Sequence, residues 1–115
     1  MKMTWLGTAA AEGWPALFCR CASCTESKKR GGKSIRSRSQ SLVNGDLLID
    51  FPADTYLHTL NGALDLDQVT DVLVTHAHED HFYPEDLANR QSCYTRFRAP
   101  HVLHIYGNDA VCAAY

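Results

Sequence analysis

A short apolar stretch, Val72 to Val74, is followed at once by a dense group of side chains that bind metals. Neutral imidazole and carboxylate are good ligands for zinc and its first-row neighbours, and ordinary core packing does not call for so many of them together. We therefore expect a metal site at the end of a buried strand, rather than a polar loop of solvated histidines. Its candidate ligands are three histidines and an aspartate: His76, His78, Asp80 and His81.

The spacing of these residues suggests how they would share metal ions. Alternate side chains of an extended chain point to the same side, so His76 and His78 can hold one ion after the strand 72–75. Asp80 and His81 follow a turn and are placed to hold a second ion. Two metals about 3.5–4 Å apart share a bridging water, lower its pKa and stabilise the leaving oxygen in an in-line displacement. The motif therefore predicts hydrolysis by hydroxide, oriented by Asp80, without a protein nucleophile.

The motif and the segments before it resemble a known family. The run from His76 to His81, preceded by 47–50 and by Gly7-Thr8, resembles the metallo-β-lactamase superfamily of metallohydrolases. Gly13-Trp14-Pro15 and the cysteine-rich run 19–24 make the chain similar to the branch that contains the phosphodiesterase of the carbon–phosphorus lyase pathway. The resemblance implies a mixed α/β (α+β) fold, two active-site zinc ions with manganese as an alternative, and a small phosphodiester or nucleotide-like substrate.

Chain length limits how much of such a domain is present. A complete αββα sandwich of this superfamily needs roughly 200–250 residues, and the chain has 115. We therefore expect residues 1–115 to form the N-terminal half of one domain, inactive alone and completed by a C-terminal half or a complementary chain. A homodimer is a further expectation. The resemblance implies that the remaining ligands, two histidines and a bridging aspartate, lie beyond Tyr115. His101 and His104 do not match those positions and are interpreted as surface or core residues, with a compensating ligand role as the alternative.

Asp50 ends the apolar stretch Leu47-Leu48-Ile49 and should lie near the metal loop. A carboxylate there can accept the second ring N–H of a ligating histidine and fix its tautomer. The resemblance favours this role, and a plain strand-end or turn carboxylate is the alternative. Glu79 alternates away from the ligands and should face solvent.

Three cysteines, Cys19, Cys21 and Cys24, form a second candidate metal site. Thiolates at this spacing can wrap one structural zinc if a fourth ligand arrives from elsewhere, and a reducing cytoplasm would keep them available. The resemblance implies that the fourth ligand is a histidine near the end of a full-length chain. Reduced cysteines without a metal are the alternative, because Cys93 and Cys112 show that this sequence also uses cysteine outside the cluster.

Local signals predict the order of helices and strands. Asn44-Gly45 is a strong hairpin signal between strands 39–43 and 46–50. Helices are expected at 25–30, where Gly31-Gly32 would end the helix, at 54–60 with Leu57 and Leu60 on one face, from Pro84 to about 91, and from Asn108 onward. Further strands are expected at 2–6 and 102–106.

Charge and hydropathy narrow the function classes without choosing among them. No apolar run approaches the roughly 20 residues of a membrane span. The N-terminal stretch 1–6 is too short for the apolar region of a signal peptide, so a cytoplasmic protein is expected. Six cations fall between positions 28 and 38: Lys28, Lys29, Arg30, Lys33, Arg36 and Arg38. They could attract phosphate or simply form a solvated loop. A phosphodiesterase is the leading hypothesis, against a thioester, lactone or β-lactam hydrolase or a zinc-binding fragment.

Overall fold

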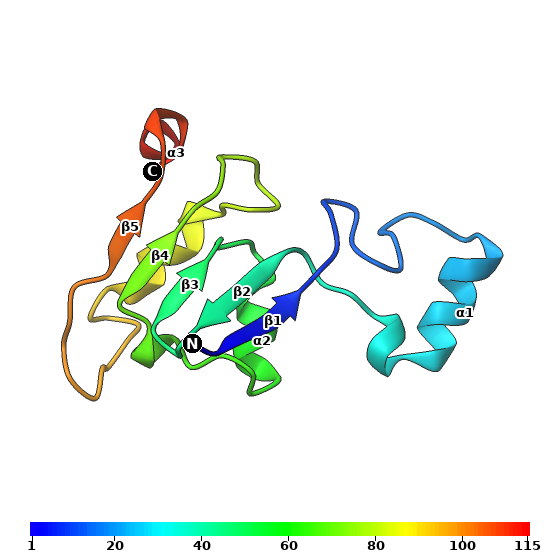
Figure 1. Ribbon diagram of the computed structural model, residues 1–115, viewed down its shortest axis with the longest axis horizontal. Helices are drawn as coiled ribbons and strands as arrows, with labels where there is room; N and C mark the ends of the chain where they lie inside the picture. Colours follow the sequence, from blue (N-terminus) through cyan, green and yellow to red (C-terminus); the bar gives the residue numbers. More distant parts are fainter.

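A five-stranded sheet organises the computed structural model, which describes residues 1–115 (Figure 1). The strands lie in chain order across the sheet: β1 (Met3–Gly7), β2 (Gln40–Val43), β3 (Leu47–Ile49), β4 (Asp71–Leu73) and β5 (His104–Tyr106). The pairs β1–β2 and β2–β3 are antiparallel, whereas β3–β4 and β4–β5 are parallel. Antiparallel neighbours need only a tight turn, but parallel ones need a crossover, which places the intervening helices on one face. The mixed sheet confirms the expected α/β class.

The turn between β2 and β3 forms as its sequence predicts. Asn44 and Gly45 both have positive φ, 52° and 86°. This pattern is typical of the two-residue hairpin turn whose twist matches that of the flanking strands. The turn sets Val43 opposite Leu47, and this register places Leu48 on the inner face of the sheet.

The helical segments include the four that were predicted, with shifted boundaries, and two short 3₁₀ segments that the sequence did not predict. They are α1 (Ala22–Arg30), η1 (Gly32–Ser34), α2 (Thr55–Leu60), η2 (Leu66–Gln68), η3 (Pro84–Arg90) and α3 (Asp109–Ala114). The helix α1 begins earlier than expected because the Cys21 side chain caps its N-terminus by accepting a hydrogen bond from the backbone N–H of Cys24. The segment η3 has 3₁₀ rather than α geometry. None of the helices combines the length and apolar character needed to cross a membrane.

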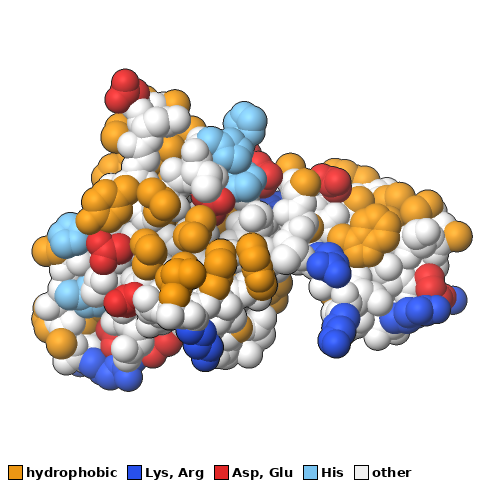
Figure 2. Space-filling model, in the orientation of Figure 1, with side chains coloured by type: hydrophobic (Ala, Val, Ile, Leu, Met, Phe, Trp, Pro, Cys, Tyr) orange, Lys and Arg blue, Asp and Glu red, His pale blue; other side chains and the backbone are white.

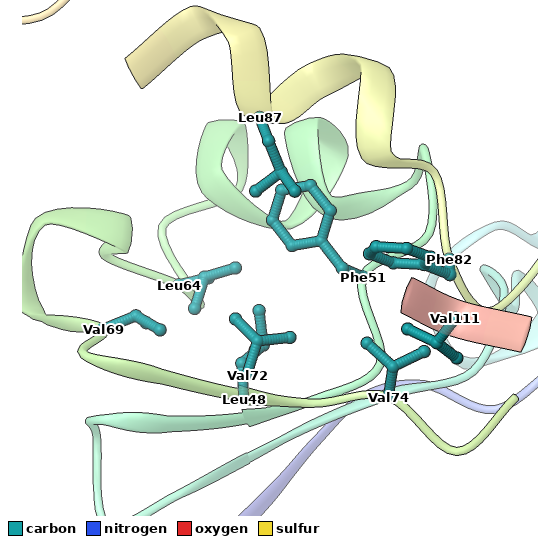
Figure 3. Close-up of a cluster of buried hydrophobic side chains, with 9 residues drawn as sticks. All are labelled: Leu48, Phe51, Leu64, Val69, Val72, Val74, Phe82, Leu87 and Val111. Carbon is teal, nitrogen blue, oxygen red and sulfur yellow. The ribbon is translucent and has the colours of Figure 1, made fainter. Parts of the chain in front are cut away.

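The hydrophobic core lies on one face of the sheet, beneath α2 and η3 (Figures 1 and 3). Leu48 and Val72, on neighbouring strands, are almost fully buried. Complete burial of side chains of this kind stabilises a fold by about 1.5–3 kcal/mol each. Buried residues from the loops, from η3 and from α3 complete the cluster: Phe51, Leu64, Val69, Val74, Phe82, Leu87 and Val111.

The helix α2 does not bury the face that its apolar residues predicted. Leu57 and Leu60 are 49% and 65% exposed, whereas Thr55 and His58 are buried. The reason is the polar partner that α2 meets on the sheet: the side chain of Gln40, buried at the start of β2, hydrogen-bonds to both Thr55 and His58.

The opposite face of the sheet has no covering layer. Strand register places Trp5, Ile49, Leu73 and Tyr106 on this face, and Trp5, Leu73 and Tyr106 are 68%, 44% and 51% exposed. Figure 2 shows hydrophobic side chains gathered across it. The helix α1 and its flanking loops lie beside the sheet and leave this face open (Figure 1).

Candidate metal centre

The candidate ligands lie on the loop that follows β4, at the edge of the sheet where histidine side chains gather in Figure 2. The backbone N–H groups of His81 and Phe82 both donate to the His78 carbonyl, which closes a tight turn. The N–H of Phe51 then donates to the His81 carbonyl at 2.7 Å, and the N–H of Tyr83 to the Phe51 carbonyl at 2.7 Å. These bonds hold the loop against the segment that leaves β3.

The loop brings the three histidine rings together. The ring centroids of His76 and His78 are 4.7 Å apart, and those of His76 and His81 are 4.1 Å apart. Asp80 joins them, because its Oδ2 lies 3.4 Å from Nε2 of His81. All four predicted ligands thus share one small region at the end of β4. Their metal-binding role stays a prediction.

Asp50 lies directly behind this group and is buried. Its Oδ2 is 2.6 Å from Nδ1 of His81, and its Oδ1 accepts the backbone N–H of Thr75 at 2.8 Å and the Thr75 hydroxyl at 2.9 Å. Since an ionised carboxylate can only accept, Nδ1 is the protonated nitrogen of His81. The other nitrogen, Nε2, is then the one available to a metal, which is the arrangement found behind metal-binding histidines. The chemistry of the donor set therefore fits a divalent cation.

A cavity of about 580 Å³ opens beside the histidine loop. Its lining residues are Ala11, Arg38, Ala53, Ala77, His78, Glu79, Asp80 and Tyr83. Glu79 is exposed, as expected. Arg38 also lines this cavity, although the sequence marks it only as one cation of a basic run.

The position of Arg38 depends on Gly7 and Asp54. A Cβ added to Gly7 would lie 1.9 Å from the Arg38 carbonyl oxygen, so only glycine allows this close approach. The Nη1 of Arg38 donates to Asp54 at 2.9 Å and its Nε to the Ala11 carbonyl at 2.9 Å. Nη2 makes no hydrogen bond within the chain. Three other cations of the basic run, at positions 28–30, lie in the last turn of α1 and do not line this cavity.

The three clustered cysteines meet at the start of α1. The sulfur atoms of Cys19, Cys21 and Cys24 all lie within 4.8 Å of one another, a spacing that could hold a metal ion. The backbone N–H of Cys24, together with the Cys19 side chain, lowers the pKa of Cys21 to about 7. Thiolate is the form that binds metals, so Cys21 is the sulfur readiest to bind near neutral pH, whereas burial and the neighbouring sulfur atoms raise the pKa of Cys24. Cys93 and Cys112 are free and exposed.

His101 and His104, which the sequence analysis did not assign as ligands, have partners outside the histidine loop. His101 Nε2 lies 2.9 Å from the Val69 carbonyl oxygen. His104, on β5, is 3.5 Å from the Asp71 carboxylate. Both therefore have structural or surface partners, as the sequence indicated.

Comparisons with known proteins identify the fold. No protein-family model matches the sequence, and neither does any curated protein. Among solved structures, a diphosphatase from the PhnP family superimposes with a TM-score of 0.72 and 24% identity, over 97% of this chain and 43% of that one. Human tRNase Z, short form, superimposes with a TM-score of 0.64 and 24% identity, over 98% of this chain and 37% of that one. Zinc-bound PqqB from Methylobacterium extorquens superimposes with a TM-score of 0.72 and 22% identity, over 97% of this chain and 38% of that one.

The chain shares its fold with all three structures, and this is the metallo-β-lactamase fold that the sequence motif predicted. The chain has the fold of the N-terminal half of that domain. It spans less than half the length of each matched structure.

Proposed function

We propose that the chain carries the first set of metal ligands of a metal-dependent hydrolase that cleaves phosphodiesters. One observation carries the proposal: the rings of His76, His78 and His81 converge at the end of β4, and Asp50 holds the far nitrogen of His81. Two metal ions bound there would supply hydroxide at neutral pH and stabilise the leaving oxygen.

In this proposal some residues of the chain would hold the metal ions, and others would orient the ligands and the attacking group. His76 and His78 would hold one ion, and Asp80 and His81 the other. Asp50 keeps the proton on Nδ1 of His81, so that Nε2 stays available. The Asp80 carboxylate, beside that nitrogen, is placed to orient the attacking group.

Arg38 supports a phosphate-containing substrate over a neutral one. Arg38 lines the same cavity as His78 and Asp80, and its Nη2 has no partner within the chain. Guanidinium groups match the geometry and charge of phosphate oxygens. Two of the similar structures, a diphosphatase and a tRNase, have names that denote phosphate chemistry. A thioester, lactone or β-lactam hydrolase on the same metals is the second candidate, favoured by the metal motif alone.

The rest of the site would come from outside residues 1–115. A dinuclear centre of this kind needs roughly six or seven protein ligands, and the loop supplies four. The bare face of the sheet and the limited coverage of the similar structures support a completing half, from the same protein or from a complementary chain or homodimer partner. The same half would bring the fourth ligand to a structural zinc at the cysteines. Reduced cysteines fit a reducing compartment such as the cytoplasm.

The test uses the complete gene product, loaded with zinc or manganese. We expect turnover of bis(p-nitrophenyl) phosphate, and loss of both metal and activity in His78→Ala. His104→Ala is the matched control, because His104 lies on β5 and outside the site. A protein that hydrolyses only nitrocefin, a lactone or a thioester would favour the second candidate. A protein that binds no metal at the histidines would exclude both.

A further inference from the structure

Asp50 has a backbone conformation that side-chain-bearing residues rarely adopt. Its φ is 65°, in the left-handed region, which aspartate tolerates better than most residues but which still costs free energy. Such a conformation persists only where the surroundings hold it. On one side, the N–H of Asp50 donates to the Leu73 carbonyl at 2.9 Å. On the other side, the carbonyl of Asp50 accepts a bond from Nε2 of Gln40 at 3.0 Å.

Gln40 is held in turn by partners on both ends of its carboxamide. It is 1% exposed, and its Nε2 donates a second bond to the Thr55 hydroxyl at 2.9 Å. Its Oε1 lies 2.6 Å from Nδ1 of His58. Since Nε2 is the only donor and Oε1 the only acceptor of this side chain, these partners leave a single orientation for the amide. It follows that Nδ1 of His58 carries the proton.

The far side of His58 completes the buried network. Its Nε2 lies 2.7 Å from the Ser37 hydroxyl, so both ring nitrogens are engaged. Burial lowers the pKa of His58, which keeps the ring neutral and preserves the proton arrangement that Gln40 requires. The network therefore presents one fixed donor, Nε2 of Gln40, to the Asp50 carbonyl.

We infer that Gln40 is a positioning residue for the metal centre. It holds the Asp50 backbone in the conformation from which the carboxylate reaches Nδ1 of His81. No other common side chain of this size does the same: glutamate lacks the donor, and methionine lacks both donor and acceptor. The inference rests on the proposed function, in which His81 is a metal ligand.

Two substitutions in the complete gene product test it. Gln40→Met removes every bond of the carboxamide. Gln40→Glu keeps an acceptor for His58, removes the amide donor to Asp50 and Thr55, and introduces a carboxylate at this buried position. Ser37→Ala is the matched control, since it breaks the same network at its far end without touching Gln40.

The first measurement is the Nδ1–H proton resonance of His81 in the metal-free protein. The second is zinc affinity at the histidine site by competition titration. We expect both Gln40 variants to shift or broaden the resonance and to lower zinc affinity about tenfold, the lower end of what loss of an outer-shell group causes. Ser37→Ala should lower thermal stability and leave both measurements unchanged. A folded Gln40→Glu protein with unaltered resonance and affinity would overturn the inference.

The unaltered protein decides the matter if neither Gln40 variant folds. Its Gln40 Nε2 protons should exchange slowly and show scalar coupling across the hydrogen bond to the Asp50 carbonyl carbon. Absence of that coupling would also overturn the inference. If the unaltered protein binds no zinc at the histidines, the proposed function fails, whereas the His81 resonance still tests Gln40.

Discussion

The carboxylate of Asp50 and the imidazole of His81 are hydrogen-bonded at 2.6 Å, although 31 positions separate them in the sequence. The same carboxylate accepts the Thr75 backbone N–H, so one buried side chain fixes both ends of the histidine loop. A loop tied in this way presents its candidate ligands already oriented.

Replacement of Asp50 by alanine should weaken metal binding at the histidines. We expect zinc affinity to fall by about 10–100-fold because His81 loses its tautomeric control. The free energy of unfolding, measured in urea, should also fall by about 1–3 kcal/mol, since the Thr75 N–H loses its acceptor. Asp46→Ala, at an exposed position on the hairpin, is the control. Equal zinc affinity in the Asp50 and Asp46 variants would contradict this role.

Replacement of Cys21 by serine should remove one zinc ion per complete protein. The hydroxyl still caps α1, but it is a poor metal ligand in place of a thiolate. Metal analysis by mass spectrometry should show one zinc fewer, with the histidine-bound metals retained and the unfolding temperature lowered. Cys93→Ser should leave the zinc count unchanged. An unchanged count in Cys21→Ser would argue against a structural site.

Replacement of Arg38 by methionine should weaken substrate binding more than catalysis. Loss of a hydrogen bond to a charged group costs about 1.5–3 kcal/mol, so KM for a phosphodiester should rise roughly tenfold or more. The kcat should change less, because Arg38 makes no hydrogen bond to the candidate ligands or to Asp50. Arg36→Met, which loses only its bond to the Thr8 hydroxyl, is the matched control. Similar KM values in both variants would speak against phosphate recognition by Arg38.

The buried His58 predicts a pH dependence of stability. Burial holds its folded-state pKa below the ordinary value of 6.5, so the unfolded chain takes up the proton first as pH falls. Stability is therefore complete above about pH 6.5 and declines below it, by at most about 1.4 kcal/mol per pH unit, until the folded-state pKa is reached. Denaturant titrations between pH 8 and 5 should show the decline in the unaltered protein and a smaller one in His58→Gln. Identical slopes would contradict it.

Residues 1–115 produced alone should self-associate. The exposed face that carries Trp5, Leu73 and Tyr106 is an apolar surface of the kind that soluble monomers rarely leave open. Leu73→Lys should reduce association in sedimentation velocity, and Leu57→Lys, an exposed position on α2 away from that face, should not. We also expect weak metal binding and no phosphodiesterase activity. A monodisperse, active monomer with two metals would refute this account.

Local sequence determined the features that depend on near neighbours. The hairpin at Asn44-Gly45 forms because these residues tolerate positive φ. The candidate ligands of the loop are recognisable because imidazole and carboxylate chemistry belongs to the side chain itself. The cysteine cluster was predictable for the same reason. Its residues lie within a single loop and the start of α1.

Only the tertiary structure decided which distant groups support them. Arg38 reaches the cavity because Gly7 admits its backbone, and the buried face of α2 carries Thr55 and His58 because Gln40 offers them polar partners. Gln40 supports Asp50 through strand register and side-chain packing rather than through any local pattern. Such contacts depend on how separate segments pack. A buried polar group takes whichever partner the fold brings within hydrogen-bonding distance, and the sequence around Gln40 carries no signal of that partner.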